Sequence, residues 1–174
     1  LSFSYVFGEI DYGQMILAAT DKGVCFLHFG DDKNDLLQAL KQEFPKAKLY
    51  ENQQREGGQL TLWLIALQQH IKHSVKAPVN VPLHLFGTLF QLKVWRFLTK
   101  IGSGQTISYQ ELANNIGNAN AQRAVANACG KNKVALLVPC HRVIRSDGQV
   151  GGYRWGQEKK QSILEHEAEI VAAK

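Results

Sequence analysis

Two capping boxes constrain the second half of this chain more than any other feature. In a capping box, the helix N-cap side chain and the side chain three residues later bond each other's backbone N–H groups. Thr88-Leu-Phe-Gln91 and Ser108-Tyr-Gln-Glu111 both have this pattern. The helix predicted after the first box directs four apolar side chains inward: Phe90, Val94, Phe97 and Leu98. The second half is therefore expected to be mainly helical.

The second capping box opens a pair of short helices. Tyr109, Leu112, Ala113 and Ile116 follow the apolar spacing of a helix, which Gly117 ends. A second helix starts within residues 121–129, and this spacing is typical of a helix-turn-helix. Its many alanines let the backbone approach a surface closely. That surface is either another helix or a nucleic-acid groove, and the basic charge of this half favours the groove.

The first part of the chain predicts a small α+β unit with a short antiparallel sheet. Three runs have the pattern of strands: Ser2–Phe7, Met15–Thr20 and Val24–Phe29. Asp31 or Asp32 is expected to cap a helix that ends at Phe44, before Pro45. A second helix is expected near Leu60–His73. Because Ala77–Pro82 holds two of the four prolines, we divide the chain into domains at 1–82 and 83–174.

The two parts differ in charge. Residues 1–82 carry eight Lys or Arg and nine Asp or Glu, whereas residues 83–174 carry twelve and six. This asymmetry favours an anionic partner for the second part, the alternative being a solvated basic face. No apolar run approaches the length of a membrane span, and no signal-peptide pattern is present.

Three cysteines cannot form a disulfide framework, which favours a reducing cytosol and a cytoplasmic protein. Cys25 and His28 have the spacing of half a zinc site, but no second pair accompanies them, so we interpret both as core residues. We expect no metal and no cofactor.

The apolar run Val134–Val138 predicts a buried extended segment that leads to Pro139, Cys140, His141 and Arg142. A cysteine after such a run is usually an inert core residue. Here its neighbours favour a nucleophile, because His141 can take a proton and Arg142 can lower the pKa of a nearby thiol. Adjacent side chains of an extended chain point apart, so a water molecule or a turn must connect Cys140 with His141.

The run Val138-Pro-Cys-His-Arg-Val143, with Ile144, resembles the active-site signature of the O6-alkylguanine-DNA alkyltransferase family. Further motifs stand in the family's order: Ser108-Tyr109, Arg123-Ala-Val125, Asn132, Gly152-Tyr153 and His166-Glu167. The runs Gly30–Asp32 and Gly152–Gly156 resemble most the bacterial adaptive-response branch of that family. The resemblance covers nearly the whole chain and is strongest from Phe86 onward.

The resemblance implies a direct, irreversible and stoichiometric transfer of an alkyl group from O6-alkylguanine in duplex DNA to Cys140. His141, oriented by Glu167, would take the thiol proton through a water molecule, and the thiol pKa would be depressed. Tyr109 would hydrogen-bond the purine, and Asn132 would brace the turn before Cys140. O4-methylthymine is a possible second substrate.

Further roles implied by the resemblance concern DNA and the flipped base. Arg123 would fill the space vacated by the rotated nucleotide. The residues expected to face DNA are Tyr109, Ala121, Gln122, Arg123, Ala126 and Asn127, and those expected to bind the base are Val143, Tyr153 and Arg154. Arg154 stands where some relatives have a serine. The expected partner is duplex DNA carrying O6-alkylguanine, with a monomeric chain and no obligate protein partner.

Two other functions remain open. A non-catalytic DNA-binding module, either a regulator or a damage sensor, would resemble this family, although the sensors lack the reactive cysteine. A cysteine hydrolase using Cys140, His141 and Glu167 would turn over repeatedly and would need neither a basic half nor a helix-turn-helix.

Overall fold

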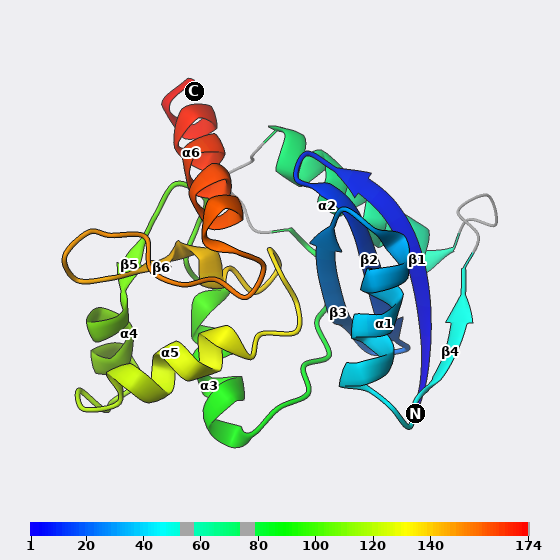
Figure 1. Cartoon of the computed structure of the whole chain (residues 1–174), viewed down its shortest axis with the longest axis horizontal. Helices are drawn as coiled ribbons and strands as arrows, with labels where there is room; N and C mark the ends of the chain where they lie inside the picture. Colours follow the sequence, from blue (N-terminus) through cyan, green and yellow to red (C-terminus); the bar gives the residue numbers. More distant parts are fainter. Residues whose placement is uncertain (53–57, 74–78, 174) are drawn as a thin grey trace. The chain divides into compact units, whose positions relative to one another are not determined.

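The computed structural model describes residues 1–52, 58–73 and 79–173, which form two compact units (Figure 1). One unit contains residues 1–73 and 79–85, and the other begins at residue 86. The elements of the first are β1 (Ser2–Ile10), β2 (Gly13–Thr20), β3 (Gly23–Gly30), α1 (Lys33–Glu43), β4 (Lys48–Glu51) and α2 (Gln59–His73). Those of the second are α3 (Leu89–Leu98), β5 (Ile107–Ser108), α4 (Tyr109–Asn115), α5 (Gln122–Gly130), the 3-10 helix η2 (Cys140–Arg142), β6 (Val143–Ile144) and α6 (Gln157–Ala173). The predicted α+β class, a sheet followed by a mainly helical part, is confirmed.

The sheet of the first unit has the strand order β3-β2-β1-β4. β1 with β2 and β2 with β3 are antiparallel, as predicted, whereas β4 pairs with β1 in parallel. We did not predict β4. It has only four residues, three of them exposed and only Leu49 half-buried, so it lacks the alternation that marks a strand.

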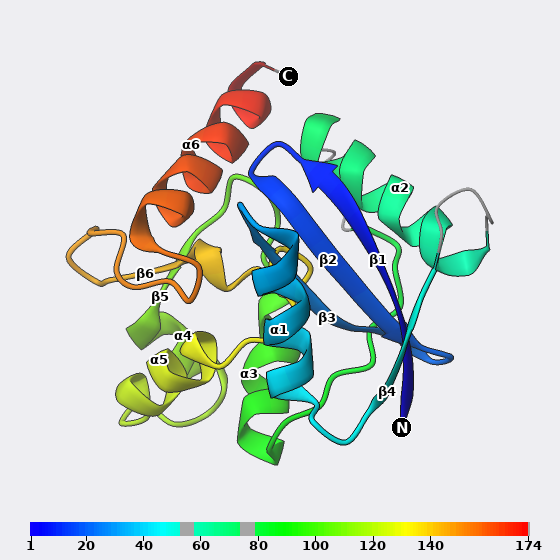
Figure 2. The same cartoon turned by 45° about the vertical axis from the view of Figure 1, so that its right-hand side comes forward.

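Helices cover both faces of this sheet (Figure 2). α1 begins where the side chain of Asp32 accepts the backbone N–H of Asn34 at 2.7 Å, as predicted. At its end, the ring of Phe44 packs against Phe3 with centroids 4.7 Å apart. α2 covers the opposite face, where a Cβ at Gly8 would lie 2.8 Å from a methyl group of Leu64. A side chain at this position would therefore force the Leu64 side chain to move.

The segment predicted to link two domains pairs with the sheet over part of its length. The backbone N–H of Val24 donates to the carbonyl of Pro82, and that of His84 donates to the carbonyl of Val24, both at 2.8 Å. Residues 79–85 therefore belong to the first unit. Residues 77 and 78 of the predicted linker lie outside the described part of the chain.

Both predicted capping boxes are present. Thr88 and Gln91 close the N-terminus of α3 reciprocally, and Ser108 and Glu111 do the same for α4. The turn between α4 and α5 starts at Gly117, whose φ of +87° favours glycine. The two short helices predicted around this glycine are thus confirmed.

The inward face of α3 differs in part from the prediction. Val94 and Leu98 are buried, but Phe90 and Phe97 are only half-buried. Trp95, which we did not assign to the core, is buried, and its indole N–H donates to the carbonyl of Ala128 in α5 at 2.9 Å, so the polar group is satisfied. This bond ties α3 to α5.

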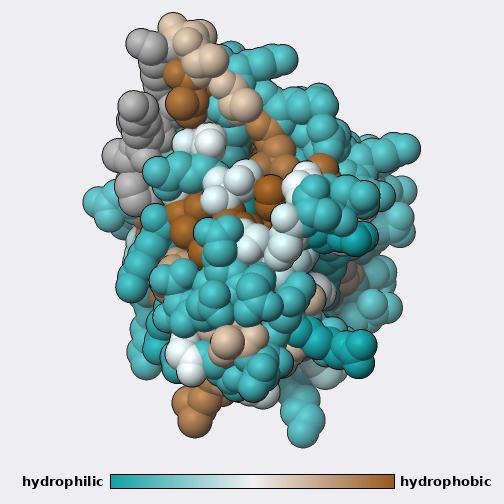
Figure 3. Space-filling view, turned by 90° about the vertical axis from the view of Figure 1, so that its left-hand side faces the viewer, coloured by the Kyte–Doolittle hydropathy of each residue, from teal (hydrophilic) through white to brown (hydrophobic). Residues whose placement is uncertain are grey.

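The second unit presents a mainly hydrophilic surface with a small apolar area on the face of Figure 3. Among the described residues, no helix combines the length and the hydrophobicity needed to cross a membrane.

Candidate alkyl-acceptor site

The chain reaches Cys140 through a turn, not through the extended segment that we predicted. Leu136 has a φ of +70°, in the left-handed region that is unusual for a residue other than glycine. The backbone N–H groups of Leu137 and Val138 donate to the carbonyls of Ala135 and Val134. An apolar run alone does not distinguish a buried strand from a buried turn, which is why the prediction was wrong.

Asn132 holds this turn against the cysteine. Its Nδ2 donates to the carbonyl of Val138 at 2.8 Å and to Cys140 Sγ at 3.2 Å. Its Oδ1 accepts the backbone N–H of Val134 at 2.9 Å. With 1% exposure, Asn132 satisfies buried groups that water cannot reach. The position is the one expected of a residue that braces the turn.

His141 and Glu167 form a buried pair beside the cysteine. His141 lies in η2, and its Nε2 is 2.8 Å from Oε1 of Glu167 in α6. Its Nδ1 makes no hydrogen bond to the described residues. Burial lowers the pKa of His141, and the nearby cations of Arg142 and Lys160 add to this, so that the imidazole is neutral at neutral pH despite Glu167. A neutral ring whose Nδ1 is available can accept a proton.

Arg142 does not act on the thiol, contrary to our expectation. Its Nε and Nη2 donate to the carboxylate of Glu167 at 3.0 and 2.8 Å, and its Nη1 donates to the carbonyl of Ile101 at 2.6 Å. The guanidinium is therefore directed away from Cys140 and fixes Glu167. Burial alone would raise the pKa of Glu167, but the hydrogen bonds from His141 and Arg142 bring it down to about 2.

A cavity of about 590 Å³ opens beside Cys140, within the range of small-ligand sites. Residues from α4, α5, η2, the loop after β6 and the start of α6 line it: Tyr109, Ala126, Cys129, Gly130, Cys140, Arg145, Gly151, Gly152, Tyr153, Arg154 and Gln157. Three expected substrate-side residues, Tyr109, Tyr153 and Arg154, thus share one cavity with the cysteine.

The pKa of the Cys140 thiol is raised, not depressed as we expected. Burial raises it to about 11, and the hydrogen bond from Asn132 and the cations Lys160 and Arg154 counteract burial only in part. At neutral pH the resting site therefore holds a thiol, and a thiolate forms only when a base removes the proton.

Lys160 is a site residue that sequence reasoning missed. Its Nζ donates to the carbonyls of Val143 at 2.5 Å and Gly152 at 3.0 Å, and it lies 3.5 Å from the hydroxyl of Tyr109. Burial lowers its pKa to about 8, although the neighbouring Cys140 and Cys129 oppose this. The only signal in the sequence was a lysine on the inward side of α6, and surface lysines are too common for that signal to stand out.

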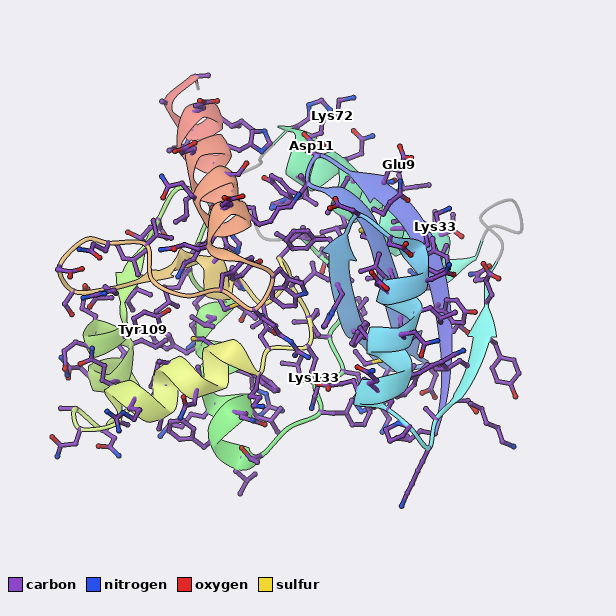
Figure 4. All side chains as sticks on the ribbon, viewed as in Figure 1. Glu9, Asp11, Lys33, Lys72, Tyr109 and Lys133 are labelled. Carbon is purple, nitrogen blue, oxygen red and sulfur yellow. The ribbon has the colours of Figure 1, made fainter. Side chains whose placement is uncertain are left out.

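Tyr109 lies at the first turn of α4 (Figure 4). Burial raises its pKa to about 12, so its hydroxyl keeps the proton and can donate it in a hydrogen bond. A Cβ on Gly151, at φ +78°, would lie 3.4 Å from this hydroxyl, so the loop after β6 passes close to Tyr109. Arg154, in the same loop, donates from Nη1 to the carbonyl of Asn132 at 2.6 Å.

The exposed face of α5 contains most of the residues expected to contact DNA. Gln122, Arg123 and Asn127 are exposed, and Ala126 is half-buried and lines the cavity. Ala121 is different, because it is buried with 7% exposure at the N-cap of the helix. The structure therefore keeps Ala121 apart from the exposed face that carries Arg123.

The remaining thiols and potential metal ligands form no separate centre in the described part of the chain. Cys25 is buried in β3 and donates to the carbonyl of Ala18, and His28 stacks on Phe26 with ring centroids 4.1 Å apart. Cys129 is buried next to the cavity. No group of three His, Cys, Asp or Glu side chains is arranged to hold a metal ion among the described residues.

Comparisons with known proteins agree with this geometry. The DNA-binding domain of 6-O-methylguanine DNA methyltransferase matches residues 89–169. The inducible methylated-DNA–protein-cysteine methyltransferase of Bacillus subtilis is 37% identical over 152 residues, which are 87% of this chain and 82% of that protein. This chain belongs to the methylated-DNA–protein-cysteine methyltransferase family.

Two further relatives extend the match over nearly the whole chain. The bifunctional transcriptional activator/DNA repair enzyme Ada of Escherichia coli is 39% identical over 97% of this chain, but the chain spans only 46% of Ada. The crystal structure of Mycobacterium tuberculosis OGT in complex with DNA superposes with a TM-score of 0.78 and 29% identity, covering 96% of this chain and 94% of that one. Both units thus have counterparts in the family.

Proposed function

We propose that this protein repairs DNA by moving an alkyl group from O6 of guanine in a duplex to its own Cys140. The observation that carries the proposal is the surroundings of Cys140. Its Sγ lies 3.2 Å from Asn132 Nδ2, beside the buried His141–Glu167 pair and in a cavity of about 590 Å³. The DNA-binding domain found in residues 89–169 and the family membership support DNA as the partner.

The reaction is a displacement at the alkyl carbon. His141 takes the Cys140 proton through a water molecule, and Glu167 stabilises the imidazolium that results. The thiolate then forms a bond to the alkyl carbon while the carbon–O6 bond breaks. The electron pair of the broken bond leaves with O6, so the purine takes up the negative charge. Tyr109, a neutral donor because of its raised pKa, stabilises that negative charge. The product thioether has no leaving group that the site can activate, so each chain reacts once.

Duplex DNA hides the O6 atom within the base stack, so the nucleotide must rotate into the cavity. Arg123 on the exposed face of α5 is proposed to fill the gap, and Gln122 and Asn127 to contact the duplex. Val143, Tyr153 and Arg154 are proposed to bind the extruded base. Because the side chain of Arg154 is engaged with the carbonyl of Asn132, we propose that its contact to the base is through the main chain.

The test is the mass of the protein after incubation with duplex DNA that contains O6-methylguanine. We expect a gain of about 14 Da, one CH₂, on the peptide that contains Cys140, with activity ending after one equivalent. Cys129, which lines the same cavity, is the internal control and should remain unmodified. Repeated turnover would indicate the hydrolase alternative, and binding without any mass change would indicate a damage sensor.

A further inference from the structure

A second cavity, separate from the alkyl-acceptor cavity, lies against α3. It has a volume of about 360 Å³ and is lined by side chains of α3, of the turn that follows it, and by Asn115 and Ile116 at the end of α4. The lining from α3 comprises Leu89, Leu92, Lys93, Arg96 and Phe97, and the turn contributes Lys100. We call this cavity the basic groove, since it contains three cations and no carboxylate.

The cations of the basic groove have no negative partner within the described chain. Lys93, Arg96 and Lys100 are exposed, and α3 contains no Asp or Glu. By contrast, Arg145 of the same unit pairs with Asp147 at 2.9 Å. Like charges three and four residues apart repel each other on a helix and weaken it. An external anion that lies over these side chains would relieve this repulsion.

The spacing of the cations suits a nucleic-acid backbone. Lys93 and Arg96 are about 4.5 Å apart along the axis of α3, and Lys100 lies two residues beyond its end. One strand of B-DNA carries a phosphate every ~3.4 Å of its axis, so a short stretch of one strand offers a phosphate to each cation. The apolar side chains of Leu92 and Phe97 in the groove suit contact with deoxyribose.

The basic groove also adjoins the helices that are proposed to bind DNA. α3 lies beside α5 in both cartoon views and packs against it, and Ile116 immediately precedes the turn between α4 and α5 (Figures 1 and 2). We propose that the basic groove binds the phosphate backbone of the same duplex, beside the damaged nucleotide. This inference rests on the proposed function and extends its DNA contact from the α4–α5 pair to α3.

The salt dependence of binding to undamaged duplex DNA tests the inference. Each phosphate contact adds about 0.9 to the slope of log affinity against log salt concentration. Replacing all three cations by glutamine (Lys93→Gln, Arg96→Gln and Lys100→Gln together) should lower that slope by roughly 2–3. The matched control removes three exposed lysines of the first unit (Lys41→Gln, Lys46→Gln and Lys48→Gln) and should change the slope far less.

Each outcome decides the question. A smaller slope in the groove variant alone supports the inference. An unchanged slope, or an equal fall in the control, overturns it, and an acidic protein segment would then be the better occupant. If thermal unfolding shows that the triple variant does not fold, the three single variants replace it, each with an expected fall of about 0.9. If the unmodified protein does not react with methylated duplex DNA, the proposed function is wrong. If it repairs normally and the groove variant has an unchanged slope, only the inference about the basic groove is wrong.

Discussion

Asn132 Nδ2 is bonded at once to Cys140 Sγ, at 3.2 Å, and to the carbonyl of Val138, at 2.8 Å. One amide thus fixes both the reacting atom and the turn that precedes it. Asn132→Ala should leave the buried N–H of Val134 without its partner and remove one of the two hydrogen bonds to the carbonyl of Val138, which also accepts the N–H of Cys140. The free energy of unfolding should fall by roughly 1–3 kcal/mol. Denaturant unfolding measures this loss, with Asn127→Ala on the exposed face of α5 as the control. A loss no larger than that of the control would contradict the bracing role.

Asn132→Asp removes the donor of this side chain and keeps the acceptor. The carboxylate still accepts the Val134 N–H but can donate to neither Sγ nor the Val138 carbonyl, so the thiol pKa should rise further above about 11. Single-turnover transfer at neutral pH should then be slower by about tenfold or more, since one unit of pKa is a factor of ten. Retained reactivity would mean that the Asn132–Cys140 bond does not help to form the thiolate.

Acid should remove the stabilisation supplied by Glu167. Its pKa is about 2 in the folded protein, against an ordinary value of 4.5, so the folded state favours the carboxylate. The contribution is fully present above about pH 4.5 and is lost as the pH falls to about 2. Glu167→Gln should cost on the order of 3 kcal/mol of unfolding free energy at neutral pH, and the difference from the parent should shrink in acid. The control is Glu169→Gln, on the exposed side of α6. A difference that does not vary with pH would contradict the assignment.

The rate of alkyl transfer should follow the protonation of His141. Because burial lowers its pKa, the rate should stay level where an exposed histidine titrates and should fall only at more acidic pH. His141→Ala should be slow near neutral pH and recover as the pH rises toward about 11, where the thiol ionises without a base. Single-turnover rates with free O6-methylguanine measure this, and His73→Ala on α2 is the control. A His141→Ala variant that shows no alkaline recovery would argue against a base.

Arg123 should affect repair of duplex DNA but not the chemistry at Cys140. If it fills the vacated stack, Arg123→Ala makes rotation of the nucleotide more costly by on the order of 1–3 kcal/mol, or roughly ten- to hundredfold in rate. The reaction with free O6-methylguanine needs no rotation and should be nearly that of the parent. Lys41→Ala in α1 controls for the lost charge. Equal loss of both activities would make Arg123 a structural residue.

The sequence predicts the helices and the first three strands of this protein better than the turns and the short strand that connect them. Ser108, Asp32 and Gly117 act locally, through a cap or a single backbone angle, so their patterns are visible in the sequence. The turn at Leu136 is also held locally, by the hydrogen bonds of Asn132 with Val134 and Val138, but the apolar run from Val134 to Val138 reads the same for a strand and for a turn. β4 was missed for a similar reason, since pairing with β1 and not its own pattern makes it a strand.

In the candidate site, too, the residues could be predicted from the sequence, but their surroundings could not. Cys140, His141 and Glu167 were identified from motifs, but their electrostatics depend on burial and on partners distant in the sequence. The raised thiol pKa follows from the burial of Cys140, and the guanidinium of Arg142 is held away from the thiol by Glu167, 25 residues away. Lys160 became visible only when α6 was folded against the carbonyls of Val143 and Gly152.

The contacts of Arg142 have a consequence for how the site forms. They join η2 to Ile101, 41 residues earlier, and to Glu167, 25 residues later. Such contacts cost more loop-closure entropy than local ones, and they are made late unless other packing has already brought the ends together. An isolated peptide with the signature around Cys140 therefore has an ordinary thiol but lacks the His141–Glu167 pair and the cavity. The base that must remove the thiol proton is held in place only where α6 has docked against η2.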